Sequence, residues 1–115
     1  MEEPMIEMFI LETTKLVEQL EQIILSSERT NGYSREMVNE IFRIMHTIKG
    51  SSAVMQIESI TSLYHAIEDL FHYLNINNPQ NVDYTIISDF VLDAVDFTKA
   101  IIGRLESGNF EDVEC

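Results

Sequence analysis

Apolar residues recur along the chain at intervals of three and four residues, which is the spacing of an amphipathic helix. No segment alternates apolar and polar residues with the two-residue period of a strand. Four helices are therefore predicted, over residues 3–28, 35–53, 58–74 and 84–107. Ser34 and Asp83 precede the second and fourth of them as N-cap residues, and Gly108 follows the fourth as a C-terminal stop.

Each predicted helix carries one apolar stripe, and the four stripes define the expected core. Its members are Met5, Phe9, Thr13, Leu16, Leu20, Ile23 and Ile24; Val38, Ile41, Phe42, Met45 and Ile48; Ile60, Leu63, Tyr64, Ile67, Leu70, Phe71 and Leu74; and Ile86, Ile87, Phe90, Val91, Ala94, Val95, Phe97, Thr98, Ile101, Ile102 and Leu105. Since the connections are short, successive helices should be antiparallel neighbours. The sequence therefore predicts an all-α fold, an antiparallel four-helix bundle that occupies residues 1–115 as a single domain.

The net charge of the chain limits the classes of partner that it can bind. Its 115 residues include 20 acidic and 7 basic side chains, which gives a formal net charge of −13. Nucleic acid and anionic membrane both attract basic surfaces, so neither is expected as a partner. No helix is predicted to have a second apolar face, so we expect the isolated domain to be monomeric.

The cellular location is predicted from signals that the sequence lacks. The N-terminus reads Met-Glu-Glu-Pro, without the basic and apolar stretches of a signal peptide. No apolar run approaches the roughly 20 residues of a membrane-spanning helix. The single cysteine, Cys115, can form no intrachain disulfide and no cysteine zinc site. These features are typical of a cytoplasmic protein.

The second predicted helix holds the first candidate for chemistry. Arg43, His46 and Lys49 follow one another at three-residue steps, which places them on one side of the helix. Gly50 comes directly afterwards, although a glycine inside a helix costs about 1 kcal/mol relative to alanine. A small residue one turn beyond His46 would let a partner molecule approach the imidazole closely.

The third predicted helix adds a second histidine and a carboxylate. His65 and Glu68 lie three residues apart, and the break near Met55 makes the second and third helices antiparallel neighbours. His46 and Glu68 are nearly equidistant from that break, so they should meet at the same height. A carboxylate that accepts a hydrogen bond from one imidazole nitrogen leaves the other nitrogen nucleophilic. Alternatively, Glu68 is an ordinary solvated charge.

Three segments resemble a known family. Residues 46–51, His-Thr-Ile-Lys-Gly-Ser, resemble the His-x-x-Lys-Gly-Ser signature of histidine phosphotransfer (HPt) domains. Residues 65–70, His-Ala-Ile-Glu-Asp-Leu, and residues 8–13, Met-Phe-Ile-Leu-Glu-Thr, resemble segments of the N-terminal HPt domain of CheA-type chemotaxis histidine kinases. The resemblance extends over about residues 5–107.

The resemblance implies a role for each residue of the candidate site. His46 would accept a phosphoryl group, and Glu68 would hold the other nitrogen of its ring. Lys49 and His65 would be hydrogen-bonding neighbours in the same site. Arg43 is added on its charge and spacing alone.

The resemblance also implies a function in a phosphorelay. A histidine kinase catalytic domain would transfer the γ-phosphoryl group of ATP to His46, and an aspartate of a CheY-type receiver domain would take it. The chain has no Walker-type or glycine-rich nucleotide motif, so it would be a phosphoryl carrier and no kinase by itself. ATP and Mg²⁺ would belong to the partner domains, and no cofactor or metal is expected here. The domain would be the N-terminal part of a longer kinase.

One departure from the family pattern concerns the turn after the second helix. The family often reads Gly-Ser-Ala-Gly-x-x-Gly, whereas Ala53 and Gln56 stand at the last two glycine positions. This predicts either a positive φ angle at Gln56 or a longer second helix.

Three other functions remain open from the sequence. A free-standing HPt protein, or an HPt domain of a hybrid kinase, would carry the same motif. A metal-binding bundle could use His65, Glu68 and His72, which share one helix face, although the Glu-x-x-His pairs of di-iron bundles are missing. A bundle that only binds other proteins would need none of the histidines.

Overall fold

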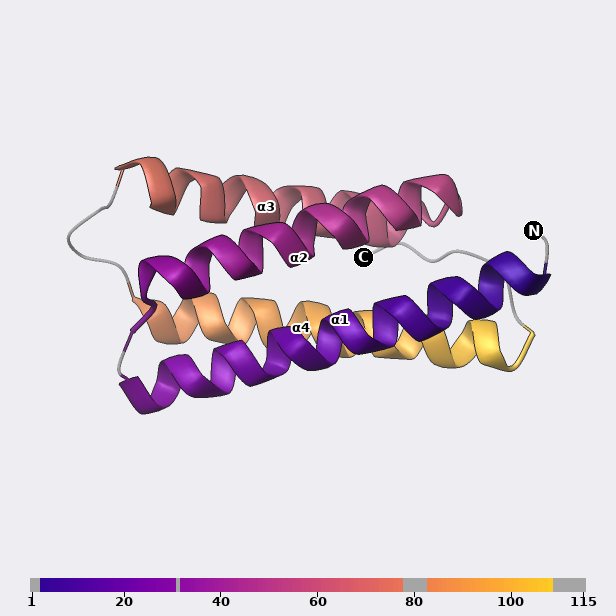
Figure 1. Ribbon diagram of the computed structural model, residues 1–115, viewed down its shortest axis with the longest axis horizontal. Helices are drawn as coiled ribbons and strands as arrows, with labels where there is room; N and C mark the ends of the chain where they lie inside the picture. Colours follow the sequence, from indigo (N-terminus) through magenta and orange to yellow (C-terminus); the bar gives the residue numbers. More distant parts are fainter. Residues whose placement is uncertain (1–2, 31, 78–82, 109–115) are drawn as a thin grey trace.

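The computed structural model describes residues 3–30, 32–77 and 83–108, which form four helices (Figure 1). Their bounds are α1 Glu3–Thr30, α2 Arg35–Val54, α3 Glu58–Asn77 and α4 Tyr84–Glu106. These residues contain no strand, so the predicted all-α class is confirmed. The main difference is at the end of α3, which continues three residues beyond the predicted position 74.

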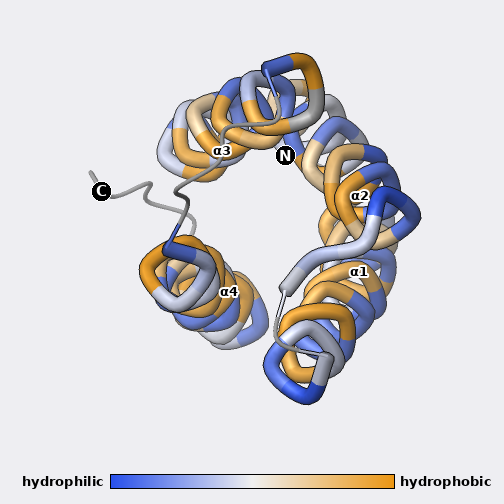
Figure 2. The backbone as a smooth tube through the Cα atoms, turned by 90° about the vertical axis from the view of Figure 1, so that its left-hand side faces the viewer, coloured by the Kyte–Doolittle hydropathy of each residue, from blue (hydrophilic) through white to orange (hydrophobic). Residues whose placement is uncertain are grey.

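The four helices surround one apolar interior, and consecutive helices run in opposite directions (Figures 1 and 2). The N-caps are those expected. The Ser34 side chain accepts a hydrogen bond from the backbone N–H of Met37, and the Asp83 side chain accepts from Thr85 and Ile86. The closest packing joins α2 to α3, while α3 and α4 are the most loosely packed neighbours. The helix that carries His46 is therefore held most firmly against the helix that carries Glu68.

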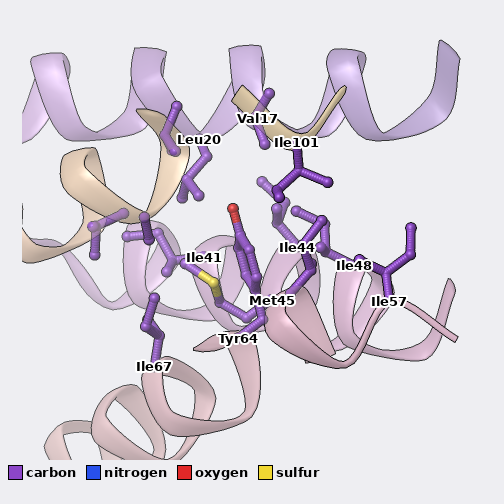
Figure 3. Close-up of a cluster of buried hydrophobic side chains, with 14 of the residues drawn as sticks. Val17, Leu20, Ile41, Ile44, Met45, Ile48, Ile57, Tyr64, Ile67 and Ile101 are labelled. Atoms are coloured by element: carbon purple, nitrogen blue, oxygen red, sulfur yellow. The ribbon is translucent and has the colours of Figure 1, made fainter. Parts of the chain in front are cut away.

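Tyr64 lies at the centre of the core, among aliphatic side chains from the other helices (Figure 3). Its hydroxyl donates a hydrogen bond to Thr98 Oγ1 at 2.6 Å, and Thr98 donates to the carbonyl oxygen of Ala94. Burial raises the pKa of the Tyr64 hydroxyl far above its usual range, so this group stays protonated and can act as the donor. The hydroxyl of Tyr64 therefore has a hydrogen-bond partner although it is buried in the middle of the bundle.

The predicted core is wrong at a few positions. In α1 the side chain of Ile6 is buried and that of Met5 is 45% exposed, because the buried positions follow seven-residue steps through Thr13 and Leu20. Val17 and Ile44, which the predicted stripes omitted, are also buried. These differences shift the buried face by a fraction of a turn and leave the bundle topology unchanged.

Two further predicted core residues, Ile86 and Phe90, are exposed on α4. Lys99 binds Glu21 of α1, so it marks the side of α4 that faces α1. Ile86 and Phe90 lie on the other side of the helix, toward α3. That edge stays open because α3 and α4 pack loosely.

The turn between α2 and α3 is a Schellman motif. The backbone N–H of Gln56 donates to the carbonyl oxygen of Ala53, and that of Ile57 donates to the carbonyl oxygen of Ser52. Gln56 has a φ angle of 61°, in the left-handed region that favours glycine. The first of the two expectations for this turn is therefore met, and α2 ends at Val54, one residue beyond the predicted position.

Gln56 and Ala53 stand where the family pattern has glycine, and replacing each with glycine should have opposite effects on stability. Gln56→Gly should raise the free energy of unfolding by about 1 kcal/mol, because it relieves a left-handed non-glycine residue. Ala53→Gly should lower the free energy of unfolding by about 1 kcal/mol, because Ala53 is inside the last turn of α2. Urea unfolding of both variants measures the two changes. Destabilisation by Gln56→Gly would contradict the account of the turn.

Candidate functional site

Glu68 is the centre of the site and is joined to α2 by two hydrogen bonds. It lies on the face of α3 that packs against α2, and only 7% of its surface is exposed. Nδ1 of His46 is 2.8 Å from Glu68 Oε2, and Nζ of Lys49 is 2.5 Å from Glu68 Oε1. Each carboxylate oxygen therefore has its own partner on α2. The predicted pairing of His46 with Glu68 is present, and Lys49 completes it.

The two α2 side chains keep Glu68 ionised despite its burial. Burial alone raises the pKa of the carboxyl, because a charged carboxylate loses hydration. The hydrogen bonds from Lys49 and His46, together with the positive charge of Lys49, outweigh that effect and hold the pKa of Glu68 below its usual value. Glu68 is thus a carboxylate at neutral pH and can only accept hydrogen bonds.

This ionisation fixes the tautomer of His46. Because a carboxylate offers no proton, Nδ1 of His46 must carry the proton of their shared hydrogen bond. The neutral ring then has its free electron pair on Nε2. The His46 side chain is 69% exposed, so Nε2 is open to a molecule from solution. The site therefore presents one oriented, nucleophilic ring nitrogen at the surface.

Gly50 leaves open space beside this histidine. A Cβ atom added to Gly50 would have no described atom within 4 Å, apart from its chain neighbours and its own helix backbone. Packing within the described part of the bundle therefore does not require a glycine at this position. The role expected for Gly50, which is to let a partner molecule approach His46 closely, stays a prediction.

The structure does not bring Arg43 or His65 into the hydrogen-bonded centre. Arg43 forms a two-pronged ion pair with Glu40, with its Nη2 atom 2.6 Å from Glu40 Oε1, because a partner three residues away is within easy reach. His65 Nε2 lies 3.5 Å from Asp69 Oδ2, one turn along the same helix. Both contacts have the three- and four-residue spacings of neighbours on one helix, which are visible in the sequence. A role for either residue in phosphoryl transfer stays a prediction.

The three side chains proposed for a metal-binding bundle each contact a different partner and do not converge on one point. Glu68 is bound by side chains of α2, and His65 lies against Asp69. The ring of His72 is centred 5.8 Å from that of Phe42 and is tilted against it by 40°. Over residues 3–30, 32–77 and 83–108, no group of three or more His, Cys, Asp or Glu side chains has the arrangement of a metal site. Within the same ranges, no helix has both the length and the apolar character needed to span a membrane.

The lowered pKa of Glu68 has a consequence for stability at acid pH. A carboxyl whose folded-state pKa is below its unfolded value stabilises the fold above the unfolded value, and this contribution is lost as the pH falls through the folded pKa. Wild type should therefore exceed Glu68→Gln in free energy of unfolding at pH 6, and the gap should narrow from about pH 4.5 downward. Urea titrations of both proteins between pH 6 and pH 3 measure the gap. A gap that widens on acidification would contradict the charge assigned to Glu68.

These features match a known family. Residues 4–107 match the family model of the Hpt domain, so the chain belongs to the Hpt domain family. It is 34% identical over 106 residues to the chemotaxis protein CheA of Treponema pallidum (strain Nichols), an alignment that covers 92% of this chain and 13% of that protein. It is 35% identical over 95 residues to the sensor histidine kinase CheAY of Helicobacter pylori (strain ATCC 700392 / 26695), covering 82% of this chain and 11% of the relative.

A third relative gives the same picture. The CheA protein of Borreliella burgdorferi (strain ATCC 35210 / DSM 4680 / CIP 102532 / B31) is 32% identical over 105 residues, covering 87% of this chain and 11% of the relative. The chain thus spans 11–13% of the length of these three relatives. No solved structure matches it significantly.

Proposed function

We propose that this protein is the phosphotransfer domain of a chemotaxis histidine kinase and that Nε2 of His46 is its phosphoryl acceptor. The observation that carries the proposal is the bond from His46 Nδ1 to the buried, ionised Glu68, which leaves Nε2 unprotonated and exposed. Membership of the Hpt family and the similarity to CheA proteins support the same role.

The chemistry consists of two in-line displacements. In the first, the electron pair of Nε2 attacks the γ-phosphorus of ATP, an N–P bond forms, and the bond to the ADP oxygen breaks. The imidazole ring gains positive charge, which the Glu68 carboxylate stabilises through Nδ1–H. In the second, a carboxylate oxygen of a receiver aspartate attacks phosphorus, the N–P bond breaks, and neutral His46 returns.

Lys49 has a supporting role in this mechanism. Its ammonium group is bound to Glu68 Oε1, so it compensates the charge of the buried carboxylate in the resting state. Its side chain is a quarter exposed and lies one turn along α2 from His46. From there its positive charge would also offset negative charge on the phosphoryl oxygens.

The partners and location follow from the same proposal. A kinase catalytic domain and a CheY-type receiver domain would meet the domain at His46, and they would supply ATP and Mg²⁺. Since ATP is a cytoplasmic substrate, we expect the reaction to take place in the cytoplasm. The similarity to CheA proteins favours the N-terminal part of a chemotaxis kinase over a free-standing or hybrid-kinase HPt protein. We expect the isolated domain to be monomeric.

The test is a reconstituted transfer. The domain is mixed with a CheA-type kinase core, Mg²⁺ and [γ-³²P]ATP, and a CheY-type receiver is added afterwards. Label should enter the domain in an acid-labile, alkali-stable form, as expected for phosphohistidine, and should leave it when the receiver arrives. A domain that takes up no label from the kinase core would contradict the proposal, and so would label stable to acid.

A further inference from the structure

A second polar contact joins α2 to α3, below the site and close to the turn. Ser52 is fully buried, and its Oγ atom lies 2.8 Å from Oγ1 of Thr61 on α3. Thr61 Oγ1 is also 3.1 Å from the carbonyl oxygen of Ile57, and Ser52 Oγ is 3.0 Å from that of Lys49. Each hydroxyl has one proton, so one of them donates to the other and the second donates to a carbonyl oxygen. The contact is therefore a closed hydrogen-bonded link between the two helices.

This link lies in the interface between α2 and α3, called the seam from here on, which also holds the candidate site. Ser52 follows Lys49 by three residues and His46 by six, so all three reach α3 from one side of α2. Thr61 precedes Glu68 by seven residues, which is two turns along one face of α3. The two polar contacts are thus about 9 Å apart along α2 and belong to one antiparallel register.

The site depends on that register more than the surrounding core does. The buried neighbours along the seam include Met45, Ile48 and Ile67, whose apolar contacts are not directional. The bonds from Glu68 to His46 and Lys49 are directional, and they weaken steeply when the angle or distance changes. The turn at Gln56 and the close packing bring α2 and α3 near this axial position. A directional contact between the two helices is suited to hold the finer alignment at which Glu68 faces both partners.

We propose that Ser52 and Thr61 are positioning residues for the phosphoryl acceptor: their hydrogen bond sets the axial register of α3 on α2 and so keeps the Glu68 carboxylate on Nδ1 of His46. Neither hydroxyl touches His46. Their effect reaches the histidine through the rigid turns between Ser52 and Lys49 and between Thr61 and Glu68. The effect on transfer rests on the proposed function, whereas the effect on the His46 tautomer does not.

The bundle offers a matched control for this proposal. Thr98 on α4 has the same chemistry as Thr61, since its hydroxyl donates to the carbonyl oxygen four residues earlier and bonds the hydroxyl of Tyr64 on a neighbouring helix. Thr98 joins α3 to α4, a pair that does not include α2. Thr61→Val and Thr98→Val therefore each remove one interhelical hydrogen bond at nearly constant volume, but only the first lies on the seam of the site.

The experiment compares four proteins: wild type, Thr61→Val, Thr61→Ser and Thr98→Val. ¹⁵N NMR of the imidazole rings, at a pH where His46 is neutral, measures the share of the tautomer with the proton on Nδ1. Thr61→Val should lower that share and slow phosphoryl uptake from a CheA-type kinase core about tenfold. Thr61→Ser keeps the hydroxyl, and Thr98→Val spares the seam, so both should match wild type. Should Thr61→Val fail to fold, Ser52→Ala removes the same bond.

The outcomes separate this inference from the proposed function. Wild-type ¹⁵N shifts in Thr61→Val would overturn the inference, and so would an equal change in Thr98→Val, because the effect would then follow stability alone. If wild type takes up no label while Thr61→Val still alters the tautomer, the proposed function fails and the positioning role is supported. If wild type is labelled and Thr61→Val matches it in tautomer and rate, the positioning role fails by itself.

Discussion

Replacing His46 with glutamine should abolish phosphoryl uptake from a CheA-type kinase core. The amide nitrogen of glutamine is not nucleophilic, so no N–P bond can form at position 46. His46 is exposed, and the amide N–H can still donate to Glu68, so the free energy of unfolding should change by less than about 0.5 kcal/mol. The measurements are label incorporation from [γ-³²P]ATP and urea unfolding on the same preparation.

His72→Gln is the matched control for this loss. His72 is another exposed histidine of the α2–α3 pair, but its ring lies against Phe42 and has no bond to Glu68. The His72→Gln variant should take up label at the wild-type rate and to the wild-type extent. Label in His46→Gln that equals wild type would show that another side chain is the acceptor, and the mechanism proposed here would be wrong.

Glu68→Gln should slow phosphoryl uptake about 10- to 100-fold although His46 is intact. The amide has one acceptor oxygen, and the neighbouring ammonium group of Lys49 can only donate, so that oxygen turns toward Lys49. The amide N–H₂ group then faces Nδ1 of His46, which must give up its proton to accept a hydrogen bond. The ring changes to the tautomer with the proton on Nε2, and the attacking electron pair is lost.

Asp69→Asn controls for the loss of one negative charge at nearly the same place. Asp69 is exposed and lies against His65, so its amide should leave both the His46 tautomer and the uptake rate close to wild type. Single-turnover labelling gives the rates, and ¹⁵N NMR gives the tautomer of each variant. Equal rates in Glu68→Gln and wild type would mean that the carboxylate does not activate His46.

The meeting of His46 and Glu68 could be predicted because it depends on two regular features. Helical periodicity indicated which side of each helix is buried, and a short turn made α2 and α3 antiparallel, with the two side chains at about the same height. The N-caps Ser34 and Asp83 were equally predictable, since capping is a local property of a few residues. Membership of the family was visible in the motif at residues 46–51.

Other contacts depend on distances between elements that periodicity does not contain. Ile86 and Phe90 continue an apolar stripe in the sequence, but their exposure follows from how loosely α4 packs on α3. Arg43 shares a helix side with His46 in the sequence, but it binds Glu40, three residues away on the same helix. The bond between Ser52 and Thr61 joins hydroxyls of residue types that occur on many helix surfaces, so no sequence pattern marks it.

The uneven packing of the four helices also decides which part of the domain opens first. Amide hydrogens exchange with solvent through local openings, and these occur most readily where few apolar contacts must be broken. The loosely packed edge between α3 and α4 is such a region, whereas the tightly packed α2–α3 pair holds His46, Glu68 and the turn at Gln56. The outer edge of α4 can therefore fluctuate without disturbing the geometry of the proposed phosphoryl acceptor. The slowest-exchanging amides of the domain should lie in the buried faces of α2 and α3.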